Sequence, residues 1–309
     1  MGQHEGTQCF IGIDLGGTNT KFGLVSREGE LLSSSTIPTP AHAGRTSLLR
    51  FVSDIASETL ARAREMGRSP ASLGVATPGW VDTSEGRVVF ASGNLPGWSG
   101  ADVAAVLRAT TGLPVCVEND ANALAVAERH YGLAREIENF VCVTLGTGIG
   151  SGCYIGGRLH YGANNLSTEL GHIPIQADGL PCSCGKTGCL EPYASASAMV
   201  RYAENAFASA EEVITAASAG DRVARNAIRT YAHFLAAGCV SVIHLMDPSL
   251  FIFAGGLTQN NPALLSDLEE EVRQRMLVPE ARDLRIMFSQ LGYFGGVLGA
   301  AAVALERLN

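Results

Sequence analysis

One motif occurs twice in this chain, and the repeat constrains the fold more than any other feature of the sequence. Residues Ile11–Thr18 form an apolar run that holds one acid and ends in a Gly-Gly-Thr turn, and Val141–Gly148 repeat that shape 130 positions later. A second apolar run follows each turn, at 21–25 and at 152–155. Two strand–turn–strand units, each opening one half of the chain, predict two related α/β lobes. The alternative is coincidence between two glycine-rich hairpins.

The rest of the chain alternates between helical and strand-like patterns. Helical spacing of apolar residues occurs over 46–66, 120–129, 194–207, 223–246, 261–276 and 299–308, and buried strands are predicted at 73–76, 115–117 and 251–254. This alternation predicts an α/β protein with mainly parallel central sheets. We expect an N-terminal lobe over 1–118, a C-terminal lobe over 119–295, and a terminal helix at 296–309 that packs back on the first lobe.

Composition narrows the class of protein. With 46 % apolar and 17 % charged residues, the 309-residue chain is typical of a globular protein rather than a disordered one. The net charge of −8 argues against binding to nucleic acid or another polyanion. The longest weakly polar stretch, 234–246, is too short to span a membrane, and the N-terminus has no signal-peptide pattern. Five scattered cysteines and one triplet favour a reducing, cytoplasmic compartment over a disulfide framework.

The two glycine-rich turns have the composition of phosphate-binding loops. Glycines let successive backbone N–H groups point into one concavity, and threonine hydroxyls add donors. The first turn holds Asp14, Gly16, Gly17, Thr18 and Lys21, the second holds Thr147 and Gly148, and a later strand ends in Gly255 and Gly256. Together they suit a nucleoside triphosphate, with Asp14 orienting water around Mg²⁺. A structural hairpin is the alternative for either turn alone.

A cluster of metal-ligand residues lies in the second half of the chain. His172, Cys182, Cys184 and Cys189 supply one imidazole and three thiols within 18 residues. Four such ligands suit tetrahedral Zn²⁺ in a closed, structural site, and we expect the zinc-binding segment to span 169–191. A disulfide with a spare thiol, or unconnected buried cysteines, are the alternatives.

A third motif, Glu118–Asn122, lies between a predicted buried strand and a predicted helix. Asp120 at this position is either the N-cap of the helix or a catalytic base facing the cleft between the lobes.

Taken together, these residues resemble the ROK family of bacterial sugar kinases, repressors and related proteins. The resemblance covers nearly the whole chain, and its most specific part is the Glu-x-Gly-His element followed by Cys-x-Cys-Gly-x-x-Gly-Cys-Leu-Glu. The matching segments are Ile11–Thr18, Thr77–Asp82, Asn94–Trp98, Glu118–Asn122, Leu145–Gly150, Glu169–His172, Cys182–Glu191 and Ala254–Leu257. Within the family, the continuation after Glu191 is typical of the glucokinases.

The resemblance implies an actin-like, hexokinase-like (ribonuclease H-like) duplicated fold and transfer of the ATP γ-phosphoryl group to a sugar hydroxyl, O6 of glucose. It implies that Asp120 accepts the hydroxyl proton and that ATP lies on the glycine-rich turns, with Gly255 and Gly256 near the adenosine. It also implies a homodimer. The sugar contacts that it implies are Asn119, Asp120, Glu169, His172 and Glu191, with Gly79 and Asn94.

Three residues depart from the family pattern. Thr168 stands where the family commonly has glycine, Trp80 where it has proline, and Ala254 where it has a third glycine. Thr168 puts tolerance of a 2-acetamido group in doubt. The alternative functions are phosphorylation of N-acetylglucosamine, N-acetylmannosamine, fructose or allose. Two further alternatives are a sugar-responsive repressor and a catalytically silent sugar sensor, and the first expects a DNA-binding segment ahead of the first turn.

Overall fold

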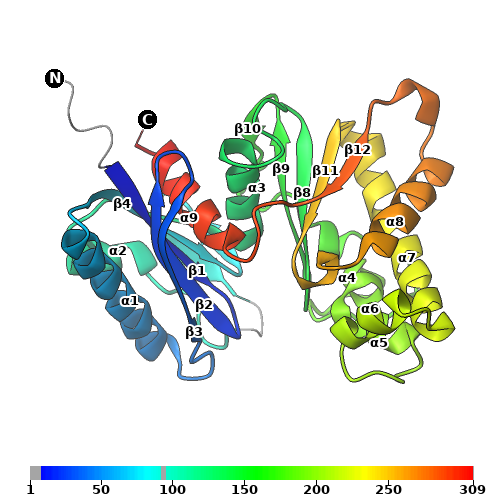
Figure 1. Cartoon of the computed structure of the whole chain (residues 1–309), viewed down its shortest axis with the longest axis horizontal. Helices are drawn as coiled ribbons and strands as arrows, with labels where there is room; N and C mark the ends of the chain where they lie inside the picture. Colours follow the sequence, from blue (N-terminus) through cyan, green and yellow to red (C-terminus); the bar gives the residue numbers. More distant parts are fainter. Residues whose placement is uncertain (1–7, 92–94, 309) are drawn as a thin grey trace. The chain divides into compact units, whose positions relative to one another are not determined.

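The computed structural model describes residues 8–91 and 95–308, and these residues form two compact units (Figure 1). Unit 1 contains the chain up to Glu136, a short insertion at Tyr161–Ser167, and the C-terminal stretch from Gln290. Unit 2 contains Ile137–His160 and Thr168–Ser289. The compact units thus divide after Glu136, whereas the sequence analysis places the division after Glu118. The helix between these two points packs on unit 1.

Unit 1 is built on a five-stranded sheet with the order β3-β2-β1-β4-β7. The first two pairings are antiparallel and the last two are parallel. The strands are β1 (Gln8–Leu15), β2 (Asn19–Ser26), β3 (Leu31–Pro38), β4 (Ser69–Thr77) and β7 (Val115–Asn119). A separate hairpin pairs β5 (Trp80–Asp82) with β6 (Arg87–Phe90).

Helices cover both faces of this sheet. The side chains of β1 alternate between the faces, so that Ile11 and Ile13 join the core under α1 (Arg45–Glu65) and α2 (Val103–Thr111), while Phe10 joins the opposite core. That opposite face carries α9 (Gly295–Glu306), which also packs against α3 (Asp120–His130). The first strand and the last helix therefore share one core within unit 1.

Glycines let α9 lie directly on the sheet. A Cβ added to Gly12 of β1 would overlap the carbonyl oxygen of Val297, and one added to Gly74 of β4 would overlap that of Ala300. A Cβ on Gly299 of α9 would likewise overlap the backbone of Ala123 in α3. The helix backbone thus approaches two strands and a second helix more closely than any larger side chain permits.

Unit 2 has a sheet of the same order, β10-β9-β8-β11-β12. Its first two pairings are antiparallel and its last two parallel, as in unit 1. The strands are β8 (Phe140–Leu145), β9 (Ile149–Ile155), β10 (Arg158–Leu159), β11 (Leu250–Ala254) and β12 (Arg285–Phe288). The predicted duplication is confirmed. The prediction of mainly parallel sheets is wrong, because each glycine-rich turn makes an antiparallel hairpin and only the helical crossovers give parallel pairs.

The helices of unit 2 differ in part from the sequence pattern. The predicted helix at 194–207 is shorter in the structure, where α5 covers only Ala196–Tyr202 and begins after the extended residue Ser195. A short helix that the sequence analysis did not predict, α4 (Glu191–Ala194), precedes it. The sequence analysis missed α2, β5, β6, β12 and α6 (Ala210–Ser218). The remaining elements are α7 (Arg222–Met246), α8 (Pro262–Arg275) and the 3-10 turns η2 (Leu170–His172), η3 (Gly256–Thr258) and η4 (Pro279–Ala281).

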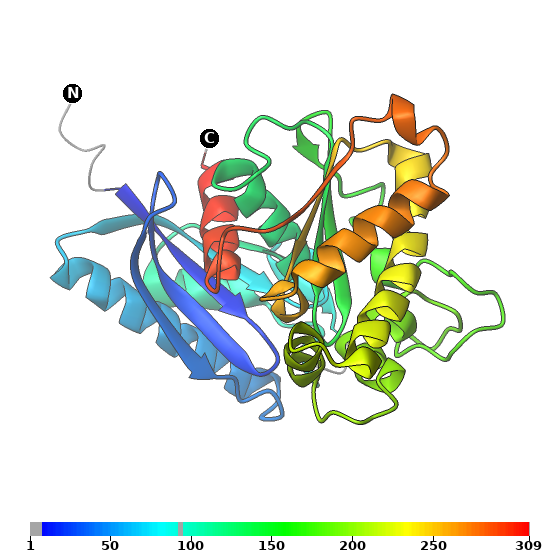
Figure 2. The ribbon, with the colours of Figure 1, turned by 45° about the vertical axis from the view of Figure 1, so that its right-hand side comes forward.

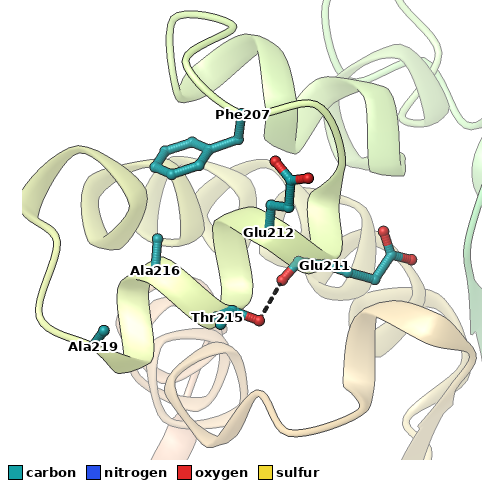
Figure 3. A pocket seen from close by; sticks show the side chains of 6 residues that line it. All are labelled: Phe207, Glu211, Glu212, Thr215, Ala216 and Ala219. Atoms are coloured by element: carbon teal, nitrogen blue, oxygen red, sulfur yellow. Dashed lines mark hydrogen bonds between the residues drawn. The ribbon is translucent and has the colours of Figure 1, made fainter.

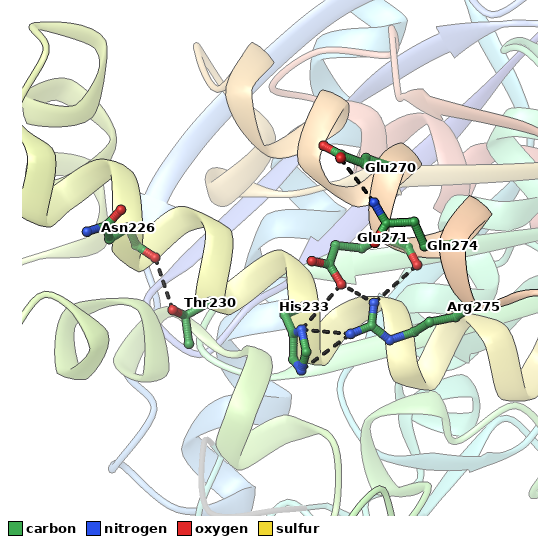
Figure 4. Close-up of polar contacts among 7 residues, drawn as sticks. All are labelled: Asn226, Thr230, His233, Glu270, Glu271, Gln274 and Arg275. Atoms are coloured by element: carbon green, nitrogen blue, oxygen red, sulfur yellow. Dashed lines mark hydrogen bonds and ion pairs between the residues drawn. The ribbon is translucent and has the colours of Figure 1, made fainter.

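Polar contacts join α7 to α8 at the surface (Figure 4). Glu271 pairs with Arg275 one turn later on α8, and His233 of α7 lies 3.3 Å from Glu271 and 2.7 Å from Arg275. Closer to the core, Arg225 forms a bidentate pair with Asp267. These contacts join the exposed sides of α7 and α8, whose buried sides are apolar.

By length and composition, α7 is the one described helix that meets the criteria for crossing a membrane. The predicted stretch 234–246 is only its second half. Just over half of its most apolar window is buried, and the side chains from Ala224 to Ile243 that face inward belong to the core of unit 2. The apolar residues of α7 are thus explained by its packing against α5, α6 and α8.

We predict that Gly74→Ala destabilises unit 1 by about 3 kcal/mol or more, because the new methyl group overlaps the backbone of α9. Urea unfolding measures this change. Gly146→Ala is the control, since no described atom lies within 4 Å of its added Cβ and its φ is not positive. Equal stabilities for the two variants would contradict the close approach of α9.

Candidate functional site

The end of β7 and the start of α3 form a rigid junction in unit 1. Asn119 is the N-cap of α3, and its side-chain oxygen accepts hydrogen bonds from the backbone N–H groups of Ala121 (2.9 Å) and Asn122 (3.1 Å). Its side-chain nitrogen donates to the carbonyl of Gly79 (3.1 Å). Because Asn119 supplies the cap, Asp120 occupies the first helical position instead. The N-cap alternative for Asp120 is therefore wrong.

The buried side chain of Glu118 stabilises this junction. Its side chain is 1 % exposed, and it accepts hydrogen bonds from the backbone of Asn119 (2.9 Å), the side chain of Asn122 (3.1 Å) and the hydroxyl of Tyr161 (2.7 Å). Burial raises the pKa of Glu118, and these three donors oppose that shift. Residues on both sides of Asp120 are thus fixed by one buried carboxyl group.

Asp14 lies at the end of β1, next to the first turn. It pairs across the hairpin with Lys21, whose Nζ is 3.9 Å away and also lies 4.2 Å from the centre of the Tyr293 ring. Burial raises the pKa of Asp14 to about 6; Lys21 opposes this shift, and the charge of Asp120 adds to it. Asp14, Lys21 and Asp120 therefore share one local electrostatic environment within unit 1.

The glycines of the first turn leave its backbone accessible. Gly16 and Gly17 are half-buried and Thr18 is exposed, and the turn is closed by a hydrogen bond from Gly16 N–H to the Asn19 carbonyl (3.2 Å). Gly79 has a φ of 102°, and a Cβ there would overlap the Phe90 carbonyl of the β5–β6 hairpin. Asn94 lies outside the described residues.

The second turn and Glu191 come together in unit 2. Oε2 of Glu191 accepts a hydrogen bond from Ile149 N–H (3.0 Å), and a Cβ on Gly148 would lie 2.6 Å from the same oxygen. Gly255 has a φ of 110°, and a Cβ there would overlap the carbonyl of Leu145 at the end of β8. Glycine is thus required at two positions where backbone meets a carboxylate or a neighbouring strand.

Two pockets of about 390 Å³ each lie in unit 2. The first extends from Thr147 of the second turn past Glu191 to Arg201, and hydroxyl groups of Ser183 and Ser195 line it. The second lies along α6, between Phe207 and Ala219 (Figure 3). Glu211 of this pocket is near Gly256, since a Cβ on that glycine would lie 3.7 Å from its carboxylate.

His172, Cys182, Cys184 and Cys189 converge as the sequence predicts. Their ligand atoms all lie within 4.8 Å of one another. His172 Nδ1 is 3.6 Å from Cys182 Sγ, and the sulfurs of Cys184 and Cys189 are 3.7 Å apart. Tetrahedral zinc with usual bond lengths sets these separations at about 3.6 and about 3.8 Å, whereas a disulfide requires about 2.05 Å. The four residues fit zinc, and the disulfide alternative is wrong for Cys184 and Cys189.

Tight turns bring these ligands together. Cys182 N–H donates to the Lys186 carbonyl (2.8 Å), and Gly188 has a φ of 77°, where a Cβ would overlap the carbonyl of Gln176. His172 closes η2, and its N–H donates to the Glu169 carbonyl (3.0 Å). Glu169 and Glu191 therefore flank the cluster in sequence and are connected to it through short backbone segments.

The structure thus groups the predicted residues by unit. In unit 1 it brings together Asp14, Lys21, Asn119, Asp120 and Gly79. In unit 2 it brings together Gly148 and Glu191, Gly255 and the end of β8, and His172 with the three cysteines.

Sequence reasoning missed several residues that support these groups. A Cβ on Gly296 at the start of α9 would overlap the Asp14 carboxylate, and Tyr293 faces Lys21. The signal was the Gly295–Gly296 pair directly before an apolar run. The sequence indicates Glu118 only as part of the 118–122 motif and carries no local signal for the buried Ser151.

Two units of identical strand order, each with a glycine-rich turn between its first two strands, define the duplicated α/β fold of actin and hexokinase. The chain belongs to the ROK family, whose model matches residues 10–307.

It is 35 % identical to a glucokinase of Streptomyces coelicolor over 96 % of this chain and 97 % of that protein. It is 32 % identical to a glucokinase of Thermotoga maritima, over 97 % and 98 % of the two chains. Among solved structures, a ROK family glucokinase from Streptomyces griseus in complex with glucose and AMPPNP superimposes with a TM-score of 0.84. That protein is 34 % identical, and the match covers 96 % of this chain and 99 % of the other.

We predict that Asp14→Asn stabilises the protein by about 1 to 2 kcal/mol at pH 7 to 8, measured without nucleotide or magnesium. Because the folded-state pKa is raised to about 6, the folded protein binds more protons than the unfolded chain between about pH 4 and 6. Ionised Asp14 therefore costs stability above pH 6, and the advantage of the variant should vanish as the pH falls to about 4.

Asp82→Asn is the matched control, because hydrogen bonds from Ser84 and Glu85 lower the pKa of this exposed carboxylate. It should give no stabilisation at any of these pH values. An Asp14→Asn variant no more stable than wild type at pH 8 would contradict the described environment of Asp14.

We predict one zinc ion per chain by elemental analysis, and loss of that ion in Cys189→Ser. Because structural zinc stabilises the fold by several kcal/mol in small sites, chelation should lower the melting temperature of the wild type. Cys116→Ala, a buried cysteine of unit 1, should retain the metal. Metal-free wild-type protein of unchanged melting temperature would refute the zinc assignment.

Proposed function

We propose that this protein is an ATP-dependent hexose kinase that transfers the γ-phosphoryl group of ATP to the 6-hydroxyl of glucose. The observation that carries the proposal is the junction at Asp120. Asp120 is the first residue of α3, and its carboxylate is not used as the helix cap because Asn119 caps the helix. Buried Glu118 fixes the residues around Asp120 through hydrogen bonds to Asn119 and Asn122. Full-length similarity to glucokinases supports the choice of acceptor.

In this proposal Asp120 accepts the proton of the sugar hydroxyl as its oxygen attacks the γ-phosphorus. The bond from the γ-phosphorus to the bridging oxygen of ADP breaks, and ADP and the sugar phosphate are released. Phosphoryl transfer depends mostly on positioning and charge stabilisation, so one aligned carboxylate suffices as the base.

Several polar side chains would hold the other sugar hydroxyls. We assign this role to Asn119, Glu169, His172 and Glu191, with Gly79 and Asn94 as further contacts. Buried acceptors favour a polyhydroxylated substrate strongly, because a sugar that lacks a hydroxyl leaves one of them without a partner. His172 presents Nδ1 to Cys182, so Nε2 is the ring nitrogen assigned to the sugar.

The nucleotide is assigned to the two glycine-rich turns. Gly16, Gly17 and Thr18 in unit 1 and Thr147 and Gly148 in unit 2 would donate to phosphate oxygens, with Lys21 adding positive charge and Gly255 and Gly256 near the adenosine. Mg²⁺ bound with ATP would neutralise phosphate charge, and Asp14 is the carboxylate that would orient its water ligands. The closed Cys₃His set leaves no open position for water, so zinc would have a structural role.

The eight free thiols of the described chain favour a reducing compartment such as the cytoplasm. A homodimer is the assembly that membership of the family suggests.

We predict that Asp120→Asn lowers kcat by about 10² to 10⁴-fold, because it removes the base, and leaves glucose binding largely intact. Coupled measurement of ATP consumption gives kcat, and equilibrium titration with glucose gives the affinity. The amide retains an oxygen that accepts from Ala121 N–H, as Asp120 does at 3.0 Å, so the helix start should persist. Near-wild-type kcat would exclude Asp120 as the base.

We predict the highest kcat/KM for glucose in an ATP-consumption assay that also tests mannose, fructose, allose and N-acetylglucosamine. Thr168 directly precedes Glu169, and this supports discrimination against a 2-acetamido group. A higher kcat/KM for another hexose would identify that sugar as the preferred substrate. If ATP consumption depended on none of these sugars, the proposed function would be overturned.

A further inference from the structure

Thr168 adopts a backbone conformation that its side chain disfavours. Its φ is +68°, in the left-handed region, where β-branched residues are rare because the Cβ substituents crowd the backbone. Such a residue persists only where the surroundings determine the conformation, and strained positions of this kind concentrate at functional sites. Thr168 is also the residue at which the chain returns to unit 2 and the one directly before Glu169.

Ser151 of β9 supplies the contacts that hold this conformation. Its side chain is buried, with 6 % exposure. The hydroxyl of Thr168 donates to the Ser151 carbonyl (3.0 Å), and the hydroxyl of Ser151 donates to the Thr168 carbonyl. The two residues are thus joined by a reciprocal pair of hydrogen bonds.

The same serine hydroxyl also accepts a hydrogen bond from Leu170 N–H (3.2 Å). One hydroxyl therefore binds the carbonyl group before Glu169 and the N–H group after it. Hydrogen bonds therefore hold the backbone on both sides of Glu169, and they fix the position from which the Glu169 side chain extends.

Strand β9 also holds a second glutamate, here directly through its carboxylate. Two residues before Ser151, Ile149 N–H holds the Glu191 carboxylate at 3.0 Å. Both glutamates assigned to the sugar are therefore positioned from one short stretch of β9, which begins directly after the second phosphate turn.

We propose that the hydrogen-bonded pair Ser151 and Thr168 forms a latch that positions Glu169 for sugar binding. The latch acts by holding the backbone of Thr168 in its strained conformation. This inference rests on the proposed function. Ser151 and Thr168 are positioning residues, because they act through Glu169 and are assigned no contact with the reacting atoms.

The latch makes a specific prediction for paired variants. Ser151→Ala removes the hydroxyl that bonds the Thr168 carbonyl and Leu170 N–H, and keeps only the bond from the Thr168 hydroxyl to the backbone carbonyl of residue 151. The strained threonine then relaxes and Glu169 shifts, so KM for glucose should rise at least about tenfold. KM for ATP should stay within about twofold of wild type, since the nucleotide turns are untouched. Thr168→Gly should keep KM for glucose within about threefold, because glycine adopts a positive φ without help from Ser151.

The double variant Ser151→Ala/Thr168→Gly separates this mechanism from a merely structural role of the serine. Glycine at 168 no longer needs the latch, so KM for glucose should recover to within about threefold of the Thr168→Gly value. Ser72→Ala is the matched control, because Ser72 is also a buried strand serine whose hydroxyl donates to a backbone carbonyl, that of Ala304 (3.0 Å). It should leave KM for glucose unchanged.

Retention of one zinc per chain shows that each variant is folded around the Cys₃His cluster. The latch is overturned if Ser151→Ala keeps the wild-type KM for glucose, or if the double variant is as impaired as Ser151→Ala. A wild-type protein that consumes no ATP with any hexose would instead overturn the proposed function, and the role of the latch with it.

Discussion

The direct contact of helix α9 with the sheet of unit 1 is the constraint on which the candidate site in that unit depends. Glycines at 12, 74 and 299 remove the side chains that would hold α9 away from β1, β4 and α3. As a result, the start of α9 reaches the Asp14 carboxylate, and the helix that begins with Asp120 packs on the same element. Burial raises the pKa of Asp14, and the charge of Asp120 adds to that shift.

In unit 2 the candidate site residues are positioned by strand β9 and by a Cys₃His cluster whose geometry fits a zinc ion. The hairpin β8–β9 supplies the second glycine-rich turn, and β9 then holds both Glu169 and Glu191 through Ser151 and Ile149. The Cys₃His cluster fixes the segment between these glutamates. Duplication has thus produced two units with one strand order, in which the turn is kept and the supporting chemistry differs.

The sequence predicted the features that depend on local patterns. The repeated glycine turn predicted the duplicated fold, and ligand spacing predicted the His172, Cys182, Cys184 and Cys189 cluster, whose ligand atoms the structure brings within reach of one ion. Features set by tertiary contacts escaped prediction. Strand β12 is only four residues long, α5 covers only part of the predicted helix at 194–207, and the latch joins residues 17 positions apart in sequence. Asp120 could not be separated from an N-cap until the cap was seen to be Asn119.

The central claim, transfer of phosphate to the 6-hydroxyl of a hexose, is tested most directly by the identity of the product. Phosphorus and carbon NMR of a reaction with glucose, ATP and Mg²⁺ should show one phosphate ester, attached at C6, in equal amount to the ADP formed. Phosphate at another carbon, or ADP accompanied only by inorganic phosphate, would contradict the account.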